Sequence, residues 1–189
     1  SWADIKDGDY TVALGDINGG NAQAAVIASA YAFGGDLNNL DPAFEFWTQM
    51  AEDGRINTLD ILQQNFETGE IPVGVIWSFT AIPYKDQITK YKLQANIPTD
   101  GSIMSGYASV INKYAPHPCA AALAREYIFS DEGQANLAAA GAIPTRTDVE
   151  IPDDIQNATF KSEDYANAIP MEDTDAVSYT HLTLPTICS

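Results

Sequence analysis

The side chains of this sequence are poorly arranged for metal or nucleophilic chemistry. Its two histidines, His117 and His181, are far apart and lack the spacing of a metal-ligand pair. Its two cysteines, Cys119 and Cys188, form no CxxC pair, which argues against zinc ribbons and thioredoxin-like redox motifs. Carboxylates are plentiful, but no spacing singles out an acid–base pair. We therefore expect no metal, no cofactor and no enzymatic activity.

Backbone groups are better placed for binding in the loop over residues 15–21 (GDINGGN). The alternating stretch 10–14 predicts a strand before this loop, and 22–33 predicts a helix that ends at Gly34 and Gly35. A strand, a glycine-rich loop and a helix expose N–H groups that suit an anion or a polar ligand group. The loop has neither GxGxxG nor GK[ST], the nucleotide fingerprints. The alternative is a plain turn in which Asn21 caps the helix.

A second candidate lies in residues 69–84 (GEIPVGVIWSFTAIPY), around which the first half of the chain is organised. The apolar run 73–76 is too short for a helix and predicts a buried strand of a parallel sheet. It ends at Trp77, and the chain then turns at Ser78 into a helical stretch. Ligands of open α/β sheets bind beyond the carboxyl ends of the strands, so Trp77 is placed to line a cleft. The alternative is an ordinary core tryptophan.

Residues 1–97 alternate between β and α patterns, which predicts an α/β fold with a mixed or parallel sheet. One helix is predicted from Asp41 to Gly54, another from Asn57 to Gly69, and a third over 80–88 with an interruption at Pro83. A further strand is predicted over 91–97. The predicted buried positions of the first two helices are Phe44, Trp47 and Met50, and Leu59, Leu62 and Phe66.

The second half begins with a turn cluster at 98–101 and a strand-like run at 103–112. Pro118 is predicted to start a helix that continues through Phe129. Ser130 is predicted to cap the next helix, which ends at Gly141. The sequence is rich in loop signals after Thr145.

Composition limits the partners. The 189 residues carry 26 acidic and 9 basic side chains, a net charge of −17, which would repel nucleic acid and anionic membrane surfaces. No apolar run is long enough to cross a membrane. The chain begins at Ser1 without an initiator Met or a signal peptide, as a fragment or processed chain would.

The C-terminal end is expected to have a different origin from the rest. Residues 177–186 (VSYTHLTLPT) resemble one reading frame of a transposase-based sequencing adapter. We expect native sequence to end near Ala176 and residues 177–189 to be a non-native tail. This interpretation removes His181 and Cys188 and leaves one native cysteine.

The order of the segments resembles the extracellular (periplasmic) solute-binding proteins of ABC importers, type II, in the group that includes iron, polyamine and phosphonate binders. The similarity covers about residues 1–170 and is carried by five stretches in the family's order: 1–16, 34–47, 66–81, 97–118 and 124–146. It implies an α/β, periplasmic-binding-protein-like type II fold. Residues 1–100 would form the second lobe and 101–176 the C-terminal, incomplete part of the first lobe.

The resemblance also implies a site between two lobes that close about a hinge. The family's cleft positions fall on Asn18, Gly19, Gly20 and Asn21, on Trp77 and Ser78, and on Ser105, Gly106 and Tyr107. Polyamine binders carry a Trp and an Asp in the crossing segment, where this chain has Ser105 and Tyr107, and iron binders tend to use adjacent tyrosines, which are absent here. A small anionic or neutral polar solute, such as a phosphonate or an organic acid, is therefore expected.

The implied partners are this solute and a membrane permease, with no nucleic acid, for a monomer in the periplasm or outside the cell. Its signal peptide would lie in the missing N-terminal part. One alternative is a ligand-sensing domain of the same fold in a signalling or regulatory protein. An enzyme is the weaker alternative, because the sequence lacks a catalytic constellation.

Overall fold

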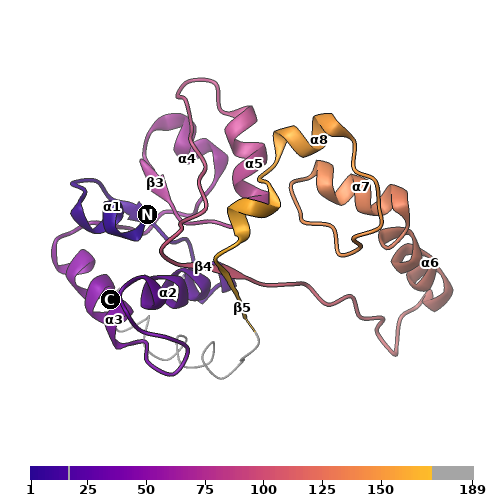
Figure 1. The fold of residues 1–189 in the computed structure, drawn as a ribbon, viewed down its shortest axis with the longest axis horizontal. Coiled ribbons are helices and arrows are strands. Elements are labelled where there is room, and N and C mark those ends of the chain that lie inside the picture. Colours follow the sequence, from indigo (N-terminus) through magenta and orange to yellow (C-terminus); the bar gives the residue numbers. More distant parts are fainter. Residues whose placement is uncertain (17, 172–189) are drawn as a thin grey trace.

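The fold begins with three short parallel strands that bring distant parts of the chain together. The computed structural model describes residues 1–16 and 18–171. Strand β1 (Val12–Ala13) lies between β2 (Ile56–Asn57) and β3 (Val73–Gly74), and both neighbours run parallel to it. The label β3 in Figure 1 marks one edge strand of this sheet. Val12 is paired with Ile56 on one side and with Val73 on the other. The predicted parallel sheet is therefore confirmed, although its strands are shorter than their apolar runs.

Helices α2 (Gly20–Ala32) and α3 (Asp41–Glu52) pack together and supply most of the core. The buried residues of α3 are Ala43, Phe46, Trp47 and Met50, whose spacing is that of one helix face. Trp47 is fully buried, and its indole N–H donates to the hydroxyl of Ser29 in α2 at 3.0 Å. Two of the three predicted core positions of α3 are thus fully buried, and Phe44 is partly buried against the same core.

Helix α1 (Trp2–Asp7) joins this core from the chain's N-terminus. Trp2 is 1 % exposed and meets the rings of Phe46 and Trp47 edge to face. Its indole N–H donates to the Gly101 carbonyl at 2.7 Å, and its backbone N–H donates to the Asp100 carboxylate at 2.8 Å. The second and the hundredth residues of the chain are therefore held side by side.

The predicted helix from Asn57 to Gly69 is wrong in its first half. Asn57 lies in β2, its side chain donates to the Glu70 carbonyl at 2.8 Å, and helix α4 (Gln63–Thr68) begins later. Leu59 and Leu62 are 41 % and 53 % exposed, because pairing with β1 takes the backbone before them out of the helical conformation. The end was predicted correctly, since Gly69 adopts the left-handed conformation at φ 82°.

Helix α5 (Ser78–Gln87) follows β3 and runs through Pro83 without the predicted interruption. A proline removes one intrahelical hydrogen bond, and the buried neighbour Ile82 anchors this part of the helix to the protein. Residues 91–97 are described throughout and form no strand, so that prediction was wrong. Their side chains are exposed or half-buried, and no neighbouring strand pairs with them.

A second sheet has two parallel strands, β4 (Ser102–Met104) and β5 (Ala168–Pro170), in which Ile103 is paired with Ile169. Ile103 also packs against the main core. Gly101 fits closely against α2, where a Cβ would lie 2.2 Å from the Ala28 carbonyl oxygen. The predicted strand 103–112 is confirmed only in its first two residues, because within residues 1–16 and 18–171 the rest has no strand to pair with.

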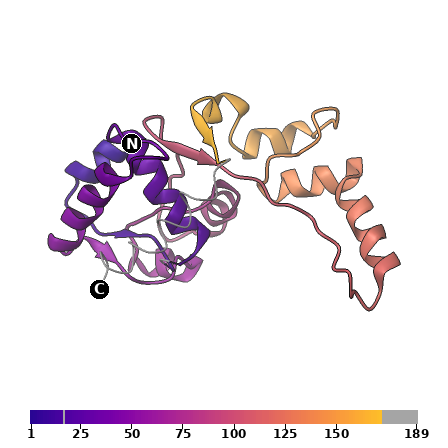
Figure 2. The ribbon, with the colours of Figure 1, turned by 90° about the horizontal axis from the view of Figure 1, so that it is seen from below.

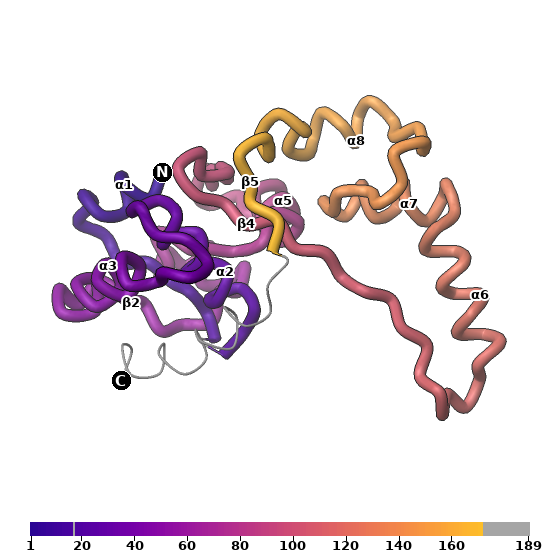
Figure 3. The backbone as a smooth tube through the Cα atoms, turned by 60° about the horizontal axis from the view of Figure 1, so that its bottom comes forward, coloured from indigo at the N-terminus to yellow at the C-terminus, as the bar shows by residue number. Residues whose placement is uncertain are grey.

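Residues 105–116 form a long extended connection from β4 to the last group of helices, as Figure 3 shows. That group comprises α6 (Pro118–Ile128), α7 (Asp131–Ala139), α8 (Asp153–Ala158) and the 3-10 helix η1 (Ser162–Tyr165). Helices α6 and α7 of this group extend away from the three-stranded sheet like an arm (Figure 2). The predicted starts at Pro118 and Ser130 are confirmed, and the Ser130 hydroxyl accepts from the Gly133 N–H at 3.1 Å.

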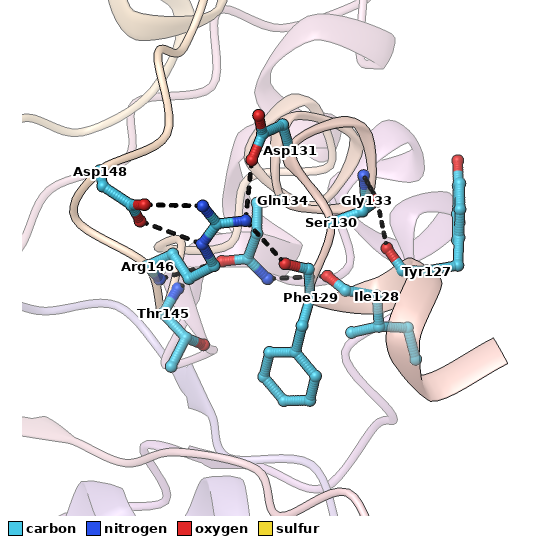
Figure 4. Close-up of polar contacts among 10 residues, drawn as sticks. All are labelled: Tyr127, Ile128, Phe129, Ser130, Asp131, Gly133, Gln134, Thr145, Arg146 and Asp148. Atoms are coloured by element: carbon cyan, nitrogen blue, oxygen red, sulfur yellow. Dashed lines mark hydrogen bonds and ion pairs between the residues drawn. The ribbon is translucent and has the colours of Figure 1, made fainter. Parts of the chain in front are cut away.

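The side chain of Gln134 joins α7 to the loop that follows it (Figure 4). It is fully buried, and its amide nitrogen donates to the Ile128 carbonyl at 2.8 Å. Its oxygen accepts from the backbone N–H groups of Thr145 and Arg146 at 2.8 and 3.1 Å. One glutamine thus connects the end of α6, the middle of α7 and the loop at 145–146.

Arg146 makes a second set of contacts beside Gln134, nearer the surface of the protein. Its guanidinium donates twice to Asp148, at 3.0 and 2.7 Å, and once to Asp131 at 2.7 Å (Figure 4). These hydrogen bonds raise the pKa of Arg146 and lower that of Asp148 from their ordinary values. A further bond at 2.9 Å reaches the Phe129 carbonyl. The guanidinium of Arg146 therefore binds groups of the chain itself and links the loop at 146–148 to the start of α7.

Candidate functional site

A cavity of ≈ 110 Å³ lies between the two sheets. Its wall includes Asn21 from α2, Trp77 and Ser78 at the start of α5, Ser102 and Ile103 of β4, and Tyr165 of η1. Helices α2 and α5 follow β1 and β3, so the cavity is next to the carboxyl ends of two neighbouring parallel strands. This is the position at which open α/β sheets bind ligands.

Asn21 connects the two strand ends beneath the cavity. Its side-chain amide donates to the carbonyl of Leu14, just after β1, at 3.1 Å and to that of Val75, just after β3. The predicted role of helix N-cap was wrong, because Gly19 holds that position and Asn21 lies in the first turn. Its amide instead fixes the spacing of the two loops from which the cavity is built.

Two helices begin next to the cavity without a side-chain cap. Gly19 and Trp77 are the N-cap residues of α2 and α5, and neither supplies a capping hydrogen bond from its side chain. The first N–H groups of a helix have no partner within the helix and carry a partial positive charge. The arrangement favours negative or hydrogen-bond-accepting groups of a bound molecule.

The cavity wall is uncharged, although the chain as a whole carries a net charge of −17. Among the residues described by the structure, those that line it include no Asp, Glu, Lys or Arg. Tyr165 is its one side chain with a shifted pKa. Burial raises the pKa of this phenol, and a side-chain hydrogen bond with Ser78 opposes part of the rise. The wall therefore offers hydroxyl, amide and indole groups, with no fixed counter-charge.

Three of the nine residues expected at the site, Asn21, Trp77 and Ser78, line this cavity together. Trp77 is half-buried and stands outside the buried core. Asn18, Gly19 and Gly20 lie in the loop and first turn behind Asn21, where the Asn18 N–H donates to the Asp16 carboxylate at 2.9 Å.

The expected residues Ser105, Gly106 and Tyr107 do not line the cavity in the described structure. All three are exposed, at the start of the extended connection after β4. Tyr107 is 83 % exposed, and its ring meets Phe79 of α5 edge to face, with the ring centroids 6.1 Å apart. Tyr107 thus contacts the residue of α5 that follows Ser78.

The structure adds Tyr165, Asn96 and Ser102 to the cavity wall. Sequence analysis missed them. Tyr165 and Ser102 lie in or beside stretches with loop signals, and Asn96 lies in a stretch that was predicted to be a strand. Ser102 follows the turn cluster that was identified at 98–101, which is the one signal that could have drawn attention to it. Tyr165 reaches the cavity only because β5 returns to pair with β4.

Comparison with protein-family models matches residues 1–169 to the family described as bacterial extracellular solute-binding protein. The match extends from α1 into β5 and so includes every element that forms the cavity. The chain belongs to this family. A comparison with curated proteins found no match.

A solute-binding protein works with an ABC transporter by binding a ligand, and its family is extracellular and typically non-enzymatic. Within the described residues, no helix is long and apolar enough to span a membrane. The same part of the chain brings no three His, Cys, Asp or Glu side chains together as a metal site. The cavity between the sheets is the candidate solute site, because it lies next to the carboxyl ends of β1 and β3. The expected tail at 177–189 lies outside both the described residues and the family match.

Proposed function

We propose that this protein is the substrate-binding component of an ABC importer, which captures a small polar solute and delivers it to a membrane permease. The observation that carries the proposal is the placement of Asn21, Trp77 and Ser78 around one cavity at the carboxyl ends of β1 and β3. Family membership supplies the solute-binding role. The location follows as the periplasm or the cell exterior.

The solute is anionic or neutral, such as a phosphonate or an organic acid. Two uncapped helix starts favour an anion, and the hydroxyl and amide groups of Ser78, Asn21 and Ser102 suit its oxygens. A polyamine needs carboxylates around its ammonium groups, and the described wall of the cavity has none. An anion would also find no lysine or arginine there, so its hydrogen bonds supply the specificity.

Residues 1–100 form the second lobe of a two-lobed protein, and 101–176 belong to the first. Support comes from the large apolar side chains that lie uncovered between β4 and the end of α7. Tyr107, Val110, Tyr114 and Leu123 are each more than two-thirds exposed, and none of the 11 residues of α6 is buried in the described structure. Apolar area of this kind marks a surface that other protein covers, and the remainder of the first lobe is that cover.

Binding closes the two lobes about the connections near residues 1–2 and 98–106. Such hinge closure encloses the solute and creates the surface that docks on the permease. Small-angle scattering of the full-length protein tests this step. An unchanged profile on addition of a bound solute would refute closure.

The binding test is a thermal-shift titration of the full-length protein with methylphosphonate, inorganic phosphate, citrate, spermidine and Fe(III). A ligand that binds only the folded state raises the melting temperature with its concentration. We expect a rise with one of the three anions, lost in Trp77→Ala and retained in Tyr114→Ala, whose side chain is 83 % exposed. A rise with spermidine or Fe(III) alone would refute the ligand class.

The variant Tyr107→Ala tests the crossing segment in the same titration. Loss of the anion response in Tyr107→Ala would support the expected contribution of residues 105–107 in the closed form. Retention of the response would limit the site to the cavity between the sheets.

A further inference from the structure

We propose that Tyr165 is the gate of the solute cavity, a side chain that covers Trp77 and sets the size of the solute that enters. The inference rests on the proposed function of the cavity and adds a residue that selects the solute. It comes from the position of one aromatic ring between two hollows of different size.

Tyr165 stands between the small cavity and a much larger one. The larger hollow, of ≈ 920 Å³, opens between the end of α7, α8 and η1. Of the residues that the structure describes, Tyr165 alone lines both hollows. Movement of this ring would therefore join a space of ≈ 110 Å³ to one of ≈ 920 Å³.

The ring lies between the cavity wall and an aromatic neighbour. Tyr165 lines the cavity together with Ser78, the first residue of α5. Its ring meets Phe160 edge to face, with centroids 6.0 Å apart and an interplanar angle of 80°. Tyr165 is only half-buried and lies at the end of a four-residue 3-10 helix, so its side chain can turn outward without unfolding a core element.

When Tyr165 turns outward, the place that it holds in the cavity wall, which it shares with Ser78 at the start of α5, becomes available to an oxygen of the solute. Binding of the solute there offsets the cost of opening the gate. A solute small enough for the closed cavity binds with the ring in place, whereas a larger one requires the open position.

Acrylamide quenching of tryptophan fluorescence tests the gate with no solute present. The sequence has three tryptophans, and Trp2 and Trp47 are 1 % and 0 % exposed, so collisional quenching reports on Trp77 in the cavity wall. We expect Tyr165→Ala to raise the quenching constant by about twofold or more, because the ring that covers Trp77 is removed. The matched control Tyr114→Ala, an exposed tyrosine far from the cavity, should leave the constant unchanged.

Two further variants keep the test decisive. Tyr165→Leu retains an apolar contact for Phe160 and replaces Tyr165→Ala if circular dichroism shows that the alanine variant is unfolded. Tyr165→Phe keeps the ring and removes the hydroxyl, so a constant near that of the unaltered protein is expected, because the ring itself is the proposed cover. A rise in Tyr165→Phe as large as that in Tyr165→Ala would overturn the assignment of the gate to the ring.

An unchanged constant in folded Tyr165→Ala or Tyr165→Leu would overturn the gate, whatever the protein binds. Failure of every probe to shift the melting temperature would overturn the proposed ligand class and leave the quenching result intact. The two failures are therefore distinguishable. Where methylphosphonate and citrate both bind, Tyr165→Ala is expected to favour the larger citrate relative to methylphosphonate, and an unchanged preference would contradict the selection by size.

Discussion

Replacement of Trp2 by phenylalanine is expected to destabilise the protein far more than its place at the second residue suggests. The Trp2 side chain is 1 % exposed, and its indole N–H donates to the buried carbonyl of Gly101 at 2.7 Å. The ring also fills a space against Phe46 and Trp47. Trp2→Phe keeps an aromatic side chain but removes both the donor and part of the ring.

The cost has two parts. A buried carbonyl that loses its partner costs about 1–3 kcal/mol. Phenylalanine is smaller by about 40 Å³, which at about 24 cal/mol per Å³ of cavity costs about 1 kcal/mol. Together they lower the free energy of unfolding by about 2–4 kcal/mol, a large share of the stability of a typical domain.

Urea unfolding followed by far-ultraviolet circular dichroism measures this cost without relying on the fluorescence of the removed tryptophan. Trp77→Phe is the matched control, and its half-buried position predicts a loss below about 1 kcal/mol. Equal losses in the two variants would refute the reasoning. Asp100→Ala removes the acceptor of the Trp2 backbone N–H, and a double-mutant cycle with Trp2→Phe should give a coupling of at least about 0.5 kcal/mol.

Three further results follow from the helical arm. Gln134→Leu should lower the free energy of unfolding by about 2–4 kcal/mol in urea, because two backbone N–H groups and a carbonyl lose their partner. Gly133→Ala should destabilise the protein despite the better helix propensity of alanine, because the added Cβ would lie 1.9 Å from the Tyr127 carbonyl oxygen. A Cβ at Gly20 meets nothing within 4 Å, so Gly20→Ala should show no loss of stability. Asp148→Asn should flatten the acid side of a stability–pH profile, since the hydrogen bonds from Arg146 lower the pKa of Asp148 when folded.

The sign of the pH effect follows from linkage. A carboxyl whose pKa is lowered by folding stabilises the protein fully above its unfolded pKa, and this contribution is lost as the pH falls through the folded value. The unaltered protein should therefore lose stability more steeply than Asp148→Asn below about pH 4. Identical slopes would show that the exposed pair contributes nothing, as holds for many surface ion pairs. For the glycine pair, a loss in Gly20→Ala as large as that in Gly133→Ala would contradict the steric argument.

The sequence by itself determined the helix boundaries that depend on local chemistry. Pro42 and Pro118 start helices, Ser130 caps one, and Gly69 ends one in the left-handed conformation. These signals act within one turn of backbone, so they do not depend on the rest of the fold. The parallel strand before Trp77 and the family resemblance were also accessible, because an apolar β-branched run and an ordered set of segments are properties of the sequence itself.

Only the tertiary structure decided which strands form and which side chains share the cavity. The stretches 91–97 and 105–112 have strand-like sequences but no strand beside them in the described part of the chain, and a strand is completed by hydrogen bonds from a partner elsewhere in the chain. Asn57 could cap a helix, yet pairing with β1 places it in a strand. Tyr165 carries no local signal and lines the cavity with Ser78 because β5 pairs with β4 across more than sixty residues of sequence. Contacts of that range are set by packing and pairing of the whole chain, which no short stretch of sequence encodes.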